Sequence, residues 1–256
     1  MKLHTQSALA LTILLAGTAV MAQTKAPEPD YTLSYNVGAV SDYRFRGISQ
    51  TSFKPALQAG IDFTHKSGFY LGAWGSNVNW IKDYVTATDG TLEIDLVGGY
   101  KGTISKDLTF DIGVITYQYP GNTAANVTVN ANTTELYGAL SYGIVTAKYS
   151  QSSGNFVANT NSSGSAYLEV AATFDLGNGL TLTPHVGRQT IPNVSVPFNN
   201  GGDYNDYALT LAKDFGNGLS VSLAAVGTNA TDGFYKVGAF DNLGKSAAVL
   251  GLKYSF

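Results

Sequence analysis

The sequence predicts an all-β protein, a transmembrane antiparallel β-barrel of about twelve strands, and three observations favour this fold class. Apolar residues alternate with polar or small ones at period two along most of the chain. Short turns alternate with long polar connections, as in barrels of the bacterial outer membrane. The final stretch, 246–256, places apolar residues at every second position and finishes on Phe256. An open apolar edge invites aggregation, whereas a barrel pairs its last strand with its first.

Composition excludes several classes of protein. A net charge of −3 gives no reason to expect binding to nucleic acid. The chain has no cysteine, so disulfides and thiolate metal sites are excluded. No apolar run reaches the roughly 20 residues that a membrane-spanning helix needs. Tyrosine is abundant (16) and charged residues are few (13%), which favours a secreted β protein over a helical membrane protein.

The N-terminal region is typical of a secretory signal peptide. Residues 1–22 combine a short polar start, an apolar run too short to span a bilayer, and small residues before a cleavage site after Ala22. Residues 23–30 contain two prolines and no periodicity, so we expect a periplasmic lead-in there. The barrel is therefore expected over 31–256.

The first strand is expected over 31–47, because apolar residues such as Tyr35 and Val37 alternate there with small or polar ones. Glycine-rich turns, including Gly-Asn-Gly at 177–179 and again at 216–218, join neighbouring strands in pairs. A soluble β-sandwich, the alternative fold, has no reason to place all its short turns at one end. The other strands are expected at 55–66, 68–80, 91–103, 108–115, 133–142, 144–151, 165–176, 180–191, 204–215, 219–228 and 246–256.

Three segments near the start carry a family resemblance. They are VSDYRFRGISQT at 40–51, PALQ at 55–58 and GFYLGAWGSN at 68–77. In these segments the chain resembles the TorF-like family, also called Gcw_chp, whose members are classed as outer-membrane porins. The resemblance is most specific over 31–80 and is compatible with the rest of the chain. It implies an outer-membrane barrel and brings no catalytic residues.

Along the strands, the charged residues lie at the alternate positions that face away from the apolar residues. If the apolar face of each strand contacts lipid, the charged residues face the lumen, since an Arg or Lys facing lipid near the midplane would cost about 2–4 kcal/mol. The expected lumen residues are Asp42, Arg44, Arg46, Asp62, Glu93, Asp95, Asp111, Glu135, Lys148, Glu169 and His185.

Two interiors are compatible with such charges: a filled core of ion pairs, or a wet channel. Many inward positions carry Gly, Ser, Thr or Ala, which favours the channel. For twelve strands, standard spacing and tilt give a backbone radius of about 12 Å, and inward side chains leave room for small solutes only. We expect Asp42 to pair with Arg44 or Arg46, and this group to form a basic constriction in a weakly cation-preferring pore.

The sequence therefore favours a porin, a passive outer-membrane channel for small polar solutes, and not an enzyme. His65 and His185 lie in poor positions for catalysis, and no cofactor or metal is expected. Expected partners are outer-membrane lipid, small solutes and the barrel-assembly machinery, for which Phe256, Tyr254 and Leu252 form the signal. The alternative is a non-conducting barrel whose polar loops at 120–132, 152–164, 192–203 and 229–245 bind a partner.

Overall fold

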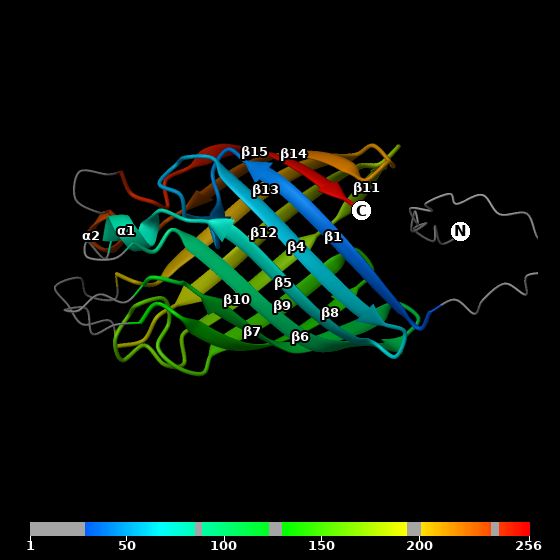
Figure 1. Cartoon of the computed structure of the whole chain (residues 1–256), viewed down its shortest axis with the longest axis horizontal. Helices are drawn as coiled ribbons and strands as arrows, with labels where there is room; N and C mark the ends of the chain where they lie inside the picture. Colours follow the sequence, from blue (N-terminus) through cyan, green and yellow to red (C-terminus); the bar gives the residue numbers. More distant parts are fainter. Residues whose placement is uncertain (1–28, 85–88, 123–129, 194–200, 237–240) are drawn as a thin grey trace, which may run out of the picture.

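A computed structural model describes residues 29–84, 89–122, 130–193, 201–236 and 241–256 and shows an antiparallel β-barrel (Figure 1). The expected signal peptide lies outside the described residues, as does most of the lead-in, so both stay predictions. The barrel strands are β1 (Tyr31–Val40), β4 (Ala56–His65), β5 (Phe69–Asn77), β6 (Leu92–Ser105), β7 (Leu108–Gln118), β8 (Thr133–Tyr142), β9 (Val145–Ser152), β10 (Ala166–Ala172), β11 (Phe174–Gly177), β12 (Leu180–Thr190), β13 (Tyr204–Asp214), β14 (Leu219–Thr228) and β15 (Ala247–Ser255).

Each barrel strand pairs with its neighbours in chain order, and β1 pairs with β15 to close the cylinder. β10 and β11 both pair with β12 and are separated only by Thr173, so they form one interrupted strand. The thirteen strands of the sheet, as far as the chain is described, therefore make a closed barrel of twelve, as the sequence predicts. Because each barrel strand pairs on both sides, hydrogen bonds between strands can satisfy the main chain without water, as a membrane-spanning sheet requires.

The closing pair is held at its end by Phe256. Tyr35 N–H donates to the Phe256 carbonyl at 2.9 Å, and Phe256 N–H donates back to Tyr35 at 3.0 Å. The two rings stack with centroids 5.8 Å apart. This confirms the prediction that the last strand pairs with the first.

The two ends of the barrel differ in their connections. Short turns, such as 66–68 and 143–144, join strands at one end, which we call the turn end; β1 begins and β15 finishes there (Figure 1). The long connections gather at the other end, the loop end, together with the short helices α1 (Trp80–Tyr84) and α2 (Asp232–Tyr235). Within the described residues, no helix is long and apolar enough to cross a membrane.

The barrel has an apolar outer surface. Large hydrophobic side chains at alternate strand positions are exposed there because they point away from the lumen. This surface is what a lipid-facing barrel needs. Representative members are Leu33, Val37, Leu57, Leu71, Leu96, Ile112, Leu136, Leu168, Val186, Leu209, Leu223 and Leu250.

The first predicted strand was wrong in its extent, and this difference changes the lumen most. The strand expected over 31–47 ends at Val40, and residues 41–55, which we call the inward loop, fold into the barrel. The loop contains a small hairpin of β2 (Arg44–Phe45) and β3 (Ile48–Ser49). Arg46 and Gly47 reverse the chain between them with φ values of 49° and 80°, a conformation that favours glycine at the second position. The alternation of apolar with polar residues continues from β1 into this hairpin, so the sequence pattern does not mark where the strand ends.

Candidate functional site

The inward loop spans the lumen through Arg46. Its guanidinium donates to Glu135 on β8 at 2.6 Å and to Gln189 on β12 at 2.7 Å. Both strands lie far from β1 in the order of the barrel, so this contact joins opposite walls. The charge also lies 4.3 Å from the centroid of the Tyr167 ring. Arg46 is thus a buried tie between the loop and the far wall.

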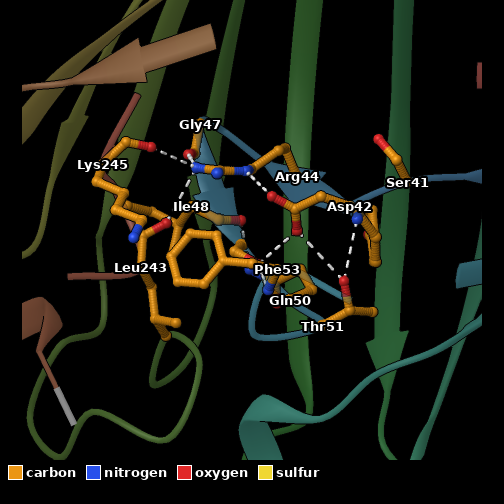
Figure 2. A network of polar contacts seen from close by, with 12 residues as sticks. Ser41, Asp42, Arg44, Gly47, Ile48, Gln50, Thr51, Phe53, Leu243 and Lys245 are labelled. Carbon is orange, nitrogen blue, oxygen red and sulfur yellow. Dashed lines mark hydrogen bonds and ion pairs between the residues drawn. The ribbon is translucent and has the colours of Figure 1, made fainter. Parts of the chain in front are cut away.

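Arg44 anchors the base of the loop to the last connection of the chain. Its Nε donates to Asp42 at 2.5 Å, so the expected pairing of Asp42 with one of the two arginines is present. Its Nη1 donates to the carbonyls of Gly47, Leu243 and Lys245 at 2.8, 3.1 and 3.0 Å (Figure 2). These partners differ entirely from those of Arg46, so the two arginines do not form one basic group.

Tyr43 fastens the start of the loop to a third part of the wall. Its hydroxyl donates a hydrogen bond to Glu93 Oε1 on β6 at 2.8 Å. Its ring packs against the Trp74 ring on β5 in a T-shaped arrangement, with the two centroids 5.3 Å apart. Burial, and next the nearby Glu93 charge, raises the pKa of Tyr43 well above its ordinary value. The hydroxyl therefore stays protonated and remains a donor to the carboxylate.

The lumen around the inward loop is filled, and we call this level the outer lumen. In the described chain, each of seven consecutive barrel strands contributes a lumen-facing side chain that is at most 7% exposed. Neighbouring hydroxyl and guanidinium groups donate to the buried carboxylates; Tyr117, for example, donates to Glu135 at 3.2 Å. The seven residues are Glu93, Tyr117, Glu135, Ser150, Tyr167, Gln189 and Asp206.

The outer lumen contains more acidic than basic side chains among the described residues. Glu93, Asp95 and Glu135 lie along β6 and β8, and one oxygen of each is buried without a hydrogen-bond partner in the described structure. In the part of the chain that the structure describes, Arg46 is the cation that pairs with this side. Burying unpaired carboxylate oxygens is costly, so the cluster favours a nearby positive charge.

The lumen toward the turn end, the inner lumen, is open by comparison. Lys101 and Asp111 lie 3.7 Å apart with side chains 62% and 26% exposed, and Asp62 is exposed. Between the two levels, His185 lies 3.1 Å from Glu169 and 3.4 Å from Asp206.

The predicted lumen residues divide between these levels. All of them project into the barrel, but Asp42, Arg44 and Arg46 do so from the inward loop and not from a barrel strand, which corrects the predicted geometry. The loop and the outer lumen contain Asp42, Arg44, Arg46, Glu93, Asp95 and Glu135, and the remainder of the lumen contains Asp62, Asp111, Lys148, Glu169 and His185.

The sequence prediction omitted several residues of the outer lumen. Asp206 and Gln189 lie on the polar face of their strands, so the alternation could have placed them among the lumen residues. Three tyrosines act as hydrogen-bond donors in the outer lumen: Tyr43, Tyr117 and Tyr167. The sequence alone does not distinguish a tyrosine that faces the lumen from one that faces lipid.

Two cavities flank the inward loop. At the loop end an apolar cavity of about 330 Å³ is lined by Phe45, Ile48, Ser49, Gln50, Trp80, Phe156, Val157, Ala158, Asn159, Ile191, Tyr204, Phe234, Tyr235 and Leu243. In the inner lumen a polar hollow of about 410 Å³ is lined by Asn36, Gly38, Val40, Gln58, Asp62, Trp74, Ser220, Ser222, Gly251, Leu252 and Lys253. Among the described residues, no group of three or more His, Asp or Glu side chains is arranged to hold a metal ion.

Known structures share this architecture at low sequence identity. The KdgM porin, solved in complex with disordered oligogalacturonate, is 8% identical with a TM-score of 0.54, covering 88% of this chain and 98% of that chain. The NanC porin is 11% identical with a TM-score of 0.54, covering 88% of this chain and 99% of that chain. These similarities establish a shared barrel fold.

Sequence comparison places the chain in a family. No curated protein matches the sequence. The model of the family described as "Bacterial protein of unknown function (Gcw_chp)" matches residues 24–256, which covers the whole described barrel. The chain therefore belongs to the Gcw_chp family, as the segments near its start indicate.

Proposed function

We propose that this protein is a porin, a passive channel for small polar solutes in the bacterial outer membrane. The observation that carries the proposal is a closed barrel with an apolar outer surface and a polar interior that is hollow at the turn end. An apolar exterior suits lipid, and the hollow in the polar interior leaves room for small solutes. The fold shared with the KdgM and NanC porins supports the same assignment.

The inward loop is the proposed constriction. It is tied to the wall through Tyr43 and Arg46 and to the last connection of the chain through Arg44, and it occupies the level where the lumen is filled. Solutes pass when this loop moves aside, so the conductance of the protein is governed by the strength of these ties. Loop motions of this kind occur on timescales of nanoseconds to milliseconds.

The proposed ion preference is for cations. Arg44 and Arg46 are each paired with a carboxylate, so the constriction itself has little net positive charge. The oligogalacturonate bound to KdgM is a polyanion, which this acidic lumen would disfavour. Acidic side chains of the predicted set outnumber basic ones: Asp42, Asp62, Glu93, Asp95, Asp111, Glu135 and Glu169 against Arg44, Arg46 and Lys148.

Localisation and assembly follow from the same proposal. The turn end would face the periplasm and the loop end the outside, with lipid around the apolar surface. Phe256, Tyr254 and Leu252 would be read by the barrel-assembly machinery, and the Tyr254 ring stacks on Phe256 at 6.0 Å. Deleting Phe256 should lower the amount of folded barrel in the outer membrane and leave the conductance of assembled molecules unchanged. Normal outer-membrane levels would contradict the assembly role.

Planar-bilayer recording of the purified, refolded barrel tests the channel. We expect discrete current steps with a reversal potential that indicates cation preference in a salt gradient. Liposome swelling should depend on solute size. A barrel that gives neither steps nor swelling, even after the inward loop has been replaced, would support the alternative of a non-conducting barrel that binds a partner.

A further inference from the structure

The two walls of the inner lumen differ in whether their polar groups are already paired. On the wall from β6 to β13, Lys101 contacts Asp111 at 3.7 Å, and Glu169 contacts His185 at 3.1 Å. On the other wall, from β14 through β15 and β1 to β5, the structure has its polar hollow of about 410 Å³. Most polar side chains that line this hollow, unlike those on the opposite wall, have no hydrogen-bond or ion-pair partner among the described residues.

The unused groups are of several kinds. Within the described ranges, the side chains of Asn36, Asp62, Ser222 and Lys253 make no hydrogen bond or ion pair to the rest of the protein. Together they supply an amide, a carboxylate, a hydroxyl and an ammonium group around one space. One negative and one positive charge cancel, so the hollow has hydrogen-bonding capacity without a preference for a net charge.

An aromatic ring completes the hollow. Trp74 lines it from β5, and its indole lies against the wall where Gly60 leaves room. A Cβ at Gly60 would lie 2.9 Å from Asn36 Nδ2 and 3.3 Å from Trp74 Cδ1, so a larger residue would displace both side chains. The glycine therefore sets the position of the ring and of the amide beside it.

We propose that this hollow binds an uncharged sugar of one or two rings immediately on the inner side of the constriction. The proposal rests on the porin function and names its class of solute. A sugar ring offers an apolar C–H face to the Trp74 indole and hydroxyl groups to Asp62 and Asn36, which is the combination present here. The volume lies within the range of about 300–1,000 Å³ that is usual for small-molecule sites.

The hollow also adjoins the inward loop. The Tyr43 and Trp74 rings pack in a T-shaped arrangement with centroids 5.3 Å apart, while the Tyr43 hydroxyl donates a hydrogen bond to Glu93. A solute stacked on Trp74 is therefore next to one of the ties that hold the loop, at the boundary between the open and the filled lumen.

Tryptophan fluorescence measures binding to this site without requiring conduction. The chain has two tryptophans, so Trp80→Phe leaves Trp74 as the single reporter in the refolded barrel. We expect a strong saturable change in emission with maltose and weaker changes with galacturonate and with a zwitterionic dipeptide of alanine, because only maltose combines the C–H ring face with uncharged hydroxyl groups. Asp62→Asn in this background should weaken the maltose response severalfold. A flat maltose titration, or an equal response to all three solutes, would overturn the proposal.

Liposome swelling measures the consequence for flux. Trp74→Ala should lower the ratio of maltose entry to dipeptide entry at low concentration by about threefold to tenfold, the worth of one aromatic contact, whatever it does to the inward loop. Tyr137→Ala removes an aromatic side chain from the opposite wall and should leave both rates unchanged. Equal losses for maltose and dipeptide in Trp74→Ala would contradict a sugar site.

The two proposals fail in different ways. If neither ions nor glycerol pass the barrel, even after the inward loop has been replaced, the porin function is wrong, whatever the fluorescence shows. If small solutes pass and maltose leaves the Trp74 emission unchanged, the porin function stands and the sugar site is wrong.

Discussion

The outer and inner levels of the lumen are built from the same strands but are filled in different ways. At the outer level, Glu93, Glu135 and Gln189 are 0% exposed because the inward loop occupies the space in front of them. At the inner level, the Lys101 side chain is 62% exposed and a hollow of about 410 Å³ remains. The barrel wall therefore sets the width of the lumen, and the inward loop determines at which level solutes can occupy it.

The comparison also shows what the charges do at each level. In the outer lumen, removing one partner of a buried ion pair leaves an uncompensated charge, which costs about 3–5 kcal/mol. In the inner lumen, an exposed pair such as Lys101–Asp111 is worth about 1 kcal/mol or less. Substitutions of similar chemistry should therefore have large effects at the outer level and small ones at the inner level.

Replacing residues 42–54 with a short Gly-Ser linker should have the largest effect. Without the inward loop, the outer lumen is as wide as the barrel wall allows, so single-channel conductance should rise by about fivefold or more. Planar-bilayer recording measures this, and far-UV circular dichroism checks that the strands persist. An unchanged conductance in a folded barrel would mean that the loop does not limit passage.

Arg46→Ala should have the next largest effect. The substitution leaves Glu135 buried without its cation, so the inward loop should detach more often and the conductance should rise. The free energy of unfolding, measured in urea, should fall by about 3–5 kcal/mol. Arg188→Ala is the matched control, because the Arg188–Asp203 pair is exposed and should contribute about 1 kcal/mol or less. Equal effects of the two substitutions would contradict the distinction between the levels.

Tyr43→Phe should have a smaller effect, since it removes only the hydroxyl and keeps the ring against Trp74. Loss of a donor to a buried carboxylate costs about 1–3 kcal/mol, so brief openings should become more frequent in single-channel records.

The same tie has an expected pH dependence. Burial, with the Glu93 charge second, raises the pKa of Tyr43, so its stabilisation is complete below the ordinary value of about 10 and is lost as pH rises through the raised value. The wild type should open further at strongly alkaline pH, and this rise should be smaller in Tyr43→Phe. An identical alkaline rise in both proteins would exclude Tyr43 as its source.

Asp111→Asn should have the smallest effect. Its carboxylate is partly exposed beside Lys101, so solvent screens the loss. Conductance should stay constant, and the cation preference, read from the reversal potential, should fall by less than about twofold. A large loss of conductance would place the constriction in the inner lumen.

The barrel itself could be predicted from the sequence because period-two alternation, glycine-rich turns and the apolar C-terminal strand all depend on local chemistry. The pairing of Tyr35 with Phe256 follows once the first and last strands must close the sheet. The interruption of one strand at Thr173 left no clear signal in the pattern.

The inward loop could not be predicted in the same way. Residues 41–47 keep the alternation of the first strand, so a hairpin that turns into the lumen looks like a longer strand. Only the turn at Arg46 and Gly47 distinguishes the two, and glycine is common throughout this chain (29). The partners of Arg46 are on β8 and β12, far away in sequence, so their proximity depends on closure of the whole barrel.

Thiol accessibility tests most directly the claim that the inward loop fills the outer lumen. The chain has no cysteine, so Ser150→Cys in the outer lumen and Ser222→Cys in the inner hollow each place a single thiol on a lumen-facing serine. With a membrane-impermeant thiol reagent on the refolded barrel, Ser222→Cys should react about tenfold faster or more, because Ser150 is 2% exposed. Replacing residues 42–54 should bring Ser150→Cys to a similar rate. Equal rates at the two positions with the loop intact would contradict the account.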